Sequence, residues 1–139
     1  MTEAGLASAM SQKPHAIVID DDHLGRMTLG DRSLEREVLE IFARQAALTL
    51  DRIAGASPQK AAAAAHTLKG SARGIGAWRV AQAAERLEKA ASGGAEEAII
   101  QEAIAELEAA SFEARVAIGL RLSKGLTARA AFADRAFGH

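Results

Sequence analysis

Over most of this 139-residue chain, the apolar residues recur every three or four positions rather than every second position. That spacing is typical of one face of an α-helix, whereas a half-buried strand alternates apolar and polar residues. Four long segments show the spacing: Asp31 to Gly55, Ser57 to Gly76, the stretch from Gly76 to Ser92, and Ala95 to Ser123. Short connections make consecutive helices antiparallel neighbours, so the pattern predicts an all-α, up-and-down four-helix bundle.

The residues before the first long segment predict a short extra helix at the N-terminal side of the bundle. Three aspartates, Asp20 to Asp22, follow an apolar run and can cap a short helix through Leu24 and Met27. Gly30 and Asp31 then supply a helix stop and a new cap.

The chain is expected to contain one domain, at residues 17–123. Residues 1–16 are expected to be a flexible lead-in, and residues 124–139 a C-terminal tail. The last helix is expected to fray near Ser123 to Gly125.

Composition narrows the class of protein. The net charge is −1 and only 4% of the residues are aromatic, which argues against a nucleic-acid surface built on a basic field or on stacked rings. The chain has no cysteine, so disulfides, thiol nucleophiles and thiolate metal sites are excluded. No signal peptide and no apolar run long enough for a membrane helix is apparent, and a soluble, cytoplasmic protein is expected.

The stretch AHTLKGSARGIG differs from the alanine run before it, because it combines a histidine, two basic residues and three glycines. A helix turns by about 100° per residue, so Leu68 lies about 200° from His66. A buried Leu68 therefore leaves His66 facing solvent. Lys69 and Gly70 follow one turn after His66, and Arg73 follows two turns after it. These four residues are predicted to form one exposed stripe.

Gly70 is the unexpected residue of this stripe, because glycine in a helix interior costs about 1 kcal/mol relative to alanine. A missing side chain leaves room for a bulky group to approach the imidazole of His66. The charges of Lys69 and Arg73 favour an anion. An exposed imidazole beside cations suits a nucleophile that carries a phosphoryl group. A histidine without function would leave the glycine and its basic neighbours unexplained.

These residues resemble the signature of the histidine-containing phosphotransfer (HPt) domains of two-component phosphorelays. That signature reads roughly His-x-Leu-Lys-Gly-Ser, then Gly-Ala, an apolar position and Leu-Glu. This chain matches it with His66, Leu68, Lys69, Gly70, Ser71, Gly76, Ala77, Val80, Leu87 and Glu88. The upstream piece DDHLGRMTLGDRSLEREVLEIF also resembles the family's lead-in and first long helix.

The resemblance implies a phosphoryl carrier without kinase activity of its own. His66 would accept a phosphoryl group from the aspartyl phosphate of a receiver domain and relay it to another receiver domain. Lys69 would neutralise the phosphoryl oxygens, Gly70 would let the receiver approach, and Ser71 matches a position that can supply a hydroxyl. Arg73 is assigned a supporting role from helix geometry alone.

A second stretch, AIVIDDDHL, resembles the opening of a receiver domain, where an acidic pair at a strand end helps to hold magnesium. A receiver domain also needs alternating strands and helices, for which the long helical segments leave no room. The aspartates are therefore interpreted as a helix cap, and no metal site is expected. His15, His23 and His139 lack glycine or basic companions at helical spacing, and they are interpreted as ordinary loop, surface or tail residues.

The expected partners are receiver domains of response regulators or hybrid histidine kinases, and the chain is expected to be a monomer that binds neither nucleic acid nor membrane. No cofactor is expected, and magnesium is expected only in the partner receiver domain. Two alternatives remain open. One is a helical bundle that binds a partner without phosphorylation, and the other is a dimerising histidine-kinase domain that lacks its ATPase.

Overall fold

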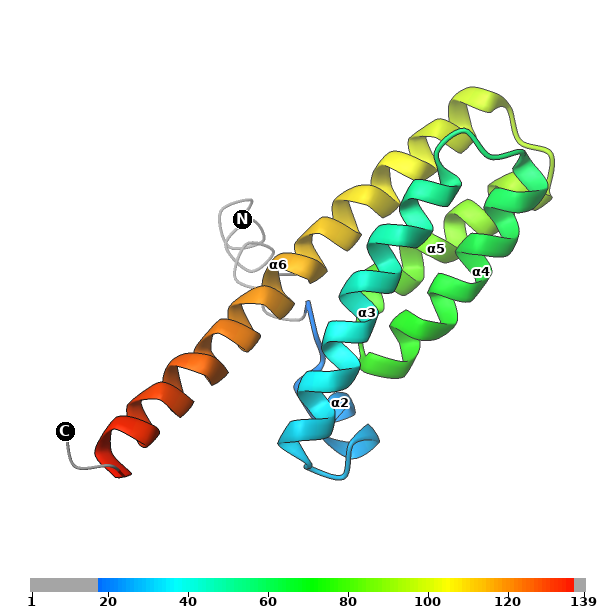
Figure 1. Cartoon of the computed structure of the whole chain (residues 1–139). Coiled ribbons are helices and arrows are strands. Elements are labelled where there is room, and N and C mark those ends of the chain that lie inside the picture. Colours follow the sequence, from blue (N-terminus) through cyan, green and yellow to red (C-terminus); the bar gives the residue numbers. More distant parts are fainter. Residues whose placement is uncertain (1–17, 137–139) are drawn as a thin grey trace, which may run out of the picture.

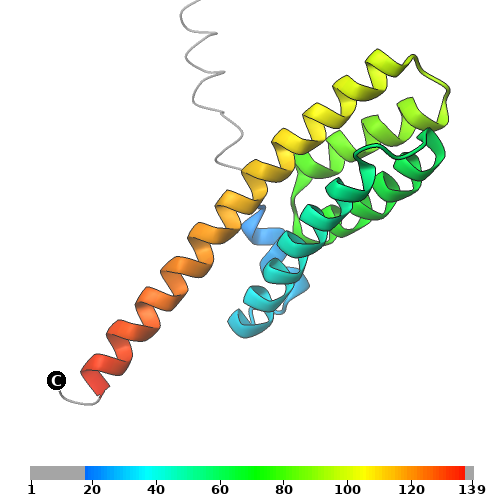
Figure 2. The same ribbon diagram turned by 45° about the horizontal axis from the view of Figure 1, so that its top comes forward.

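A computed structural model describes residues 18–136 of the chain, with side chains described for 18–124, so the predicted lead-in lies outside them. The described helices are α2 (Asp21–Met27), α3 (Arg32–Ile53), α4 (Pro58–Ile75), α5 (Trp78–Ser92) and α6 (Glu97–Ala136). The described residues contain no strand. Four long helices lie side by side, and α2 sits at one end of the bundle (Figures 1 and 2). The predicted all-α bundle with a short extra helix is confirmed.

The order of the helices around the bundle determines which surfaces are free. Helix α4 packs on α3 and α5, and α6 packs on the same two helices. Helices α4 and α6 therefore occupy opposite corners of the bundle. A partner bound to the outer side of one of them leaves the outer side of the other open.

The helix ends follow the predicted punctuation. The side chains of Asp20, Asp31 and Ser57 each accept a hydrogen bond from a backbone N–H in the first turn of α2, α3 and α4, respectively. Pro58 occupies the first turn of α4, where its missing N–H removes no helical hydrogen bond. Gly76 ends α4 with a φ of 79°, a left-handed conformation that favours glycine.

The connection between α4 and α5 also anchors the start of the described chain. The backbone N–H of Asp20 donates to the carbonyl of Gly76 over 3.0 Å, and the Trp78 indole N–H donates to the Asp20 carboxylate over 2.9 Å. The Trp78 hydrogen bond is the largest of the effects that lower the pKa of the Asp20 carboxyl. A Cβ on Gly76 would lie 2.9 Å from the Cβ of Asp20, so the close approach also requires glycine. The ring of His23 packs edge-on against Trp78, which gives this histidine a structural role.

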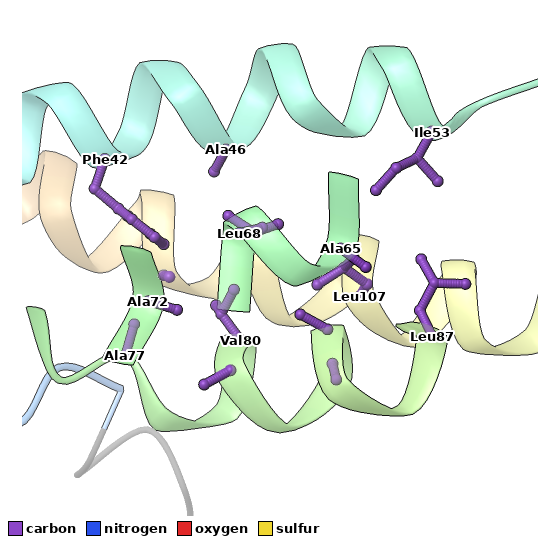
Figure 3. Packing of buried hydrophobic residues seen from close by; sticks show 14 of the residues in the cluster. Phe42, Ala46, Ile53, Ala65, Leu68, Ala72, Ala77, Val80, Leu87 and Leu107 are labelled. Atoms are coloured by element: carbon purple, nitrogen blue, oxygen red, sulfur yellow. The ribbon is translucent and has the colours of Figure 1, made fainter. Parts of the chain in front are cut away.

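Among the described residues, alanines make up twelve of the 25 that form the buried core, and larger side chains, mainly leucines and isoleucines, fill the space between the helices (Figure 3). Helix α3 buries Leu39, Phe42, Ala46 and Ile53. The three- and four-residue spacing of apolar residues in this segment also includes Ile41 and Leu48, but their side chains are exposed. Helix α3 therefore has two adjacent rows of apolar residues. The row with Leu39, Phe42 and Ala46 faces the bundle, and the row with Ile41 and Leu48 faces solvent.

The last helix is longer than the sequence pattern predicted. Helix α6 has 40 residues and continues to Ala136, so the predicted fraying near Ser123 to Gly125 is wrong. A single glycine costs a helix only about 1 kcal/mol, and the residues around it are mostly good helix formers. Helix α6 extends well past the end of the bundle (Figure 1). Despite its length, neither α6 nor any other helix in the described part of the chain is long and apolar enough to cross a membrane.

Candidate functional site

Helix α4 presents the imidazole of His66 to solvent in the middle of the helix. The side chain is 66% exposed, whereas Leu68 is almost completely buried in the core. The two side chains point to opposite sides of α4, as helix geometry predicted. The ring is therefore accessible to a macromolecular partner.

A carboxylate on α5 connects the imidazole to the neighbouring lysine. Glu88 Oε2 lies 2.7 Å from His66 Nδ1, and Glu88 Oε1 lies 2.7 Å from Lys69 Nζ. Helices α4 and α5 form an antiparallel hairpin through the Gly76–Ala77 turn, which places Glu88 beside the face of α4 that carries His66. The three side chains thus form one hydrogen-bonded chain of imidazole, carboxylate and ammonium.

The charge of Glu88 determines which nitrogen of His66 is free. The hydrogen bond from Lys69 lowers the pKa of the Glu88 carboxyl, and the hydrogen bond from His66 lowers it further, although partial burial acts in the opposite direction. An ionised carboxylate can only accept hydrogen bonds, so Nδ1 of the imidazole carries the proton. In the neutral ring the lone pair then resides on Nε2. The contact with Glu88 therefore leaves Nε2 as the ring nitrogen with a free lone pair.

Lys69 departs from the prediction that it forms part of an exposed stripe. Its side chain is only 14% exposed, because its ion pair with Glu88 draws it toward α5. The stripe of exposed residues on α4 consists instead of His66, Gly70 and Arg73. An ammonium group has three N–H donors. The contact with Glu88 uses one of them, and the other two remain for oxygens that approach the imidazole.

Gly70 lies on the open surface one turn from His66. A Cβ built at this position would meet no atom within 4 Å, so packing within the chain does not require glycine here. Arg73, one turn further along, pairs with Glu85 over 3.5 Å. Both of these side chains are well exposed, and such pairs contribute little to stability. The guanidinium can therefore exchange Glu85 for another anion at small cost.

Ser71 is separated from this group. It lines a hollow of about 260 Å³ between α3 and α4, on the flank of α4 that faces away from Glu88. The other residues that line the hollow are Gln45, Leu48, Thr49, Arg52, Thr67 and Leu68. The structure thus brings together His66, Lys69 and Glu88, with Gly70 next to them, and places Ser71 on a different side of the helix.

Glu88 is the residue of this site that the sequence reasoning did not select as functional. It was noted only as the end of the Leu87-Glu88 pair. The resemblance to HPt domains implies phosphoryl transfer to His66, and we expect Glu88→Ala to slow that transfer on the order of tenfold, because the variant fixes neither the imidazole tautomer nor the position of the lysine.

The rate of transfer from a phosphorylated receiver domain is the measurement. Glu88→Gln is the matched variant, because its amide oxygen can still accept the Nδ1–H hydrogen bond. It should retain more of the rate than Glu88→Ala. Equal rates for wild type and Glu88→Ala would show that the carboxylate does not orient the ring.

Comparisons with known proteins identify the class to which this fold and site belong. A family model for the Hpt domain matches residues 37–116, which is more than half of the 139-residue chain. The chain belongs to the Hpt domain family, and its role is histidine phosphotransfer in a phosphorelay. Receiver domains of the phosphorelay are accordingly its class of partner.

Two solved structures share the fold. One is described as a histidine-containing phosphotransfer protein from rice; it has a TM-score of 0.68 and 20% sequence identity, and the match covers 87% of this chain and 88% of that chain. The other is the histidine phosphotransferase ShpA from Caulobacter crescentus, with a TM-score of 0.55 and 29% identity over 78% of this chain and 98% of that chain. No curated protein sequence matched the chain.

Proposed function

We propose that Nε2 of His66 is the atom that accepts the phosphoryl group. The observation that carries the proposal is the hydrogen bond from Nδ1 to Glu88, which leaves the second ring nitrogen as a lone-pair donor on an exposed side chain. Within the described residues, His23 is the other histidine, and its ring packs against Trp78. Gly70 supplies the open surface that a partner's active site needs beside the ring.

In the proposed step, the Nε2 lone pair attacks the phosphorus of an aspartyl phosphate. A nitrogen–phosphorus bond forms and the bond between phosphorus and the aspartate oxygen breaks, so the aspartate leaves as a carboxylate. The imidazole keeps its Nδ1 proton and gains positive charge, which the Glu88 carboxylate stabilises. Lys69 and Arg73 are placed to offset charge on the phosphoryl oxygens. The protein thus contributes positioning and electrostatic stabilisation, which dominate catalysis of this kind of transfer.

The proposed partner is a receiver domain that supplies the acidic pocket and its magnesium ion, so the chain itself uses neither a cofactor nor ATP. The residues of the site all come from one chain, and a monomer is sufficient for the transfer step. We place the reaction in the cytoplasm, where receiver domains and ATP-dependent kinases meet. The reverse step passes the group to a second receiver by the same contacts.

The experiment is a transfer profile against the receiver domains of the source organism, each labelled with radioactive phosphate before mixing. At least one receiver should transfer its label rapidly, and the label on this chain should be labile in acid and stable in base, as expected for a phosphoramidate. An acid-stable label would point to a hydroxyl such as that of Ser71. Transfer from none of the receivers would instead favour a bundle that binds its partner without phosphorylation.

A further inference from the structure

The outer side of α6 carries an apolar stripe that faces away from the core. The side chains of Phe112, Val116 and Leu120 follow one another at one-turn intervals and are 65%, 46% and 60% exposed. Leu107 and Ile118, on the opposite side of the same helix, are fully buried. A surface helix normally places charged or polar residues on its outer face. Packing within the bundle therefore does not explain the apolar side chains on this face of α6.

The outer stripe of α6 extends in both directions along the helix. Its exposed members are Ala105, Ala109, Phe112, Val116, Gly119, Leu120 and Ser123. The positions 105, 109, 112, 116, 119 and 123 alternate in steps of four and three, and none of them is charged. Residues spaced alternately by three and four positions form the seam along which two helices pair in a coiled coil.

The charges of α6 indicate what pairs with this seam. Residues 97–114 of α6 contain five glutamates and no basic residue, whereas residues 115–136 contain five basic residues and one acidic residue. Three of these charges pair within the chain, Glu106 with Arg86, Glu113 with Arg79 and Arg121 with Asp21, whereas Glu102, Glu108, Arg115 and Lys124 have no ion-pair partner among the described residues. A second α6 running antiparallel would place its basic half on this acidic half. The change of sign, between Ala114 and Arg115, lies next to Val116 at the centre of the apolar stripe.

We propose that two copies of this chain pair through the outer stripe of α6, with the helices antiparallel and Val116 near the two-fold axis. Phe112 of one copy then lies opposite the partner's Leu120, and the reciprocal contact follows from symmetry. The pairing covers the apolar side chains and brings opposite charges together. A parallel pair would bury the same stripe but would stack like charges along both halves.

The pairing is compatible with the phosphotransfer site. Helix α4, which carries His66, occupies the corner of the bundle opposite α6. A dimer formed through α6 therefore leaves both copies of the site open to receiver domains. The proposed dimer differs from the monomer that was expected from the sequence.

The first test measures the mass of the full chain in solution by sedimentation equilibrium across the micromolar range. Wild type should show a monomer–dimer equilibrium. Val116→Glu should raise the dissociation constant at least about 100-fold, because it places two like charges together at the two-fold axis. Ile99→Glu is the matched control, because Ile99 lies on α6, is 50% exposed and is not part of the stripe. It should dimerise as wild type does.

A wild type that stays monomeric throughout, or a Val116→Glu variant that dimerises as wild type does, would overturn the proposal. Val116→Glu should also accept phosphate from its receiver at the normal rate. Reduced transfer in this variant would assign the stripe to receiver docking and would equally overturn the proposal.

The second test determines the orientation of the pair and uses the fact that the chain contains no cysteine. Phe112→Cys and Leu120→Cys should form a mixed disulfide when the two variants are combined and oxidised. Neither variant should cross-link with itself, because eight residues of helix separate the two positions by about 12 Å. That offset exceeds the reach of a disulfide. Self-cross-linking of each variant would show a parallel pair and contradict the antiparallel assignment.

Discussion

Phosphorylated receiver domains should transfer no detectable label to His66→Gln, whereas they label wild type rapidly. Glutamine has no nucleophilic nitrogen, since its amide lone pair is delocalised into the carbonyl. The folded state should be little affected, because the imidazole is mostly exposed and contributes little packing. We expect the free energy of unfolding to change by less than about 0.5 kcal/mol. Circular dichroism of the variant, measured beside the transfer assay, separates loss of chemistry from loss of fold.

Two further variants act as controls for His66→Gln. His23→Gln removes a histidine that packs on Trp78, and Ser71→Ala removes a hydroxyl that lines the hollow beside α3. Both should still be labelled. Label that persists on His66→Gln would show that another residue accepts the phosphoryl group.

The helix boundaries could be predicted because their causes are local. The side chains of Asp31 and Ser57 each accept a hydrogen bond from the backbone N–H three residues further along the chain. Gly76 adopts a left-handed conformation at the end of α4. Each of these signals is readable within a few residues of sequence. The end of α6 was not predictable in this way, because a single glycine and a serine do not stop a helix whose other residues favour it.

The exposure of His66 also followed from a single helix, once Leu68 was assigned to the core. The contact with Glu88 required the register between two helices. Ala77 lies eleven residues after His66 and eleven residues before Glu88, so a tight turn at Ala77 brings them to the same level of an antiparallel hairpin. The sequence therefore contained a usable signal for this contact.

The burial of Lys69 was harder to predict. On the helical wheel, Lys69 lies between the exposed face of α4 and the face that packs on α5. Its partner Glu88 decides which way the side chain turns. A helical wheel of α4 alone does not include Glu88, because Glu88 lies on α5. The same limit applies to the outer face of α6, where a single-helix pattern shows an apolar row but not whether another molecule covers it.

Gly70→Gln should make the protein more stable and a poorer phosphoryl acceptor. Glutamine is a better helix former than glycine by several tenths of a kcal/mol or more, and the position has open space around it, so the melting temperature should rise by a few degrees. A new side chain one turn from His66 would hold the receiver's aspartyl phosphate away from the imidazole. A displacement of about 1 Å can cost on the order of 100-fold in rate, and we expect a loss of that size.

The substitution can be tested against two variants that separate stability from access. Gly70→Ala should gain similar helix stability but slow transfer much less, because a methyl group reaches a shorter distance above the helix. Gly119→Gln makes the same chemical change on α6, where a Cβ also meets nothing within 4 Å, and it should leave the rate of transfer unchanged. Melting curves and single-turnover transfer rates from one labelled receiver give both quantities for each protein. If Gly70→Gln accepted phosphate as fast as Gly119→Gln, the open surface beside His66 would not be the reason for the glycine.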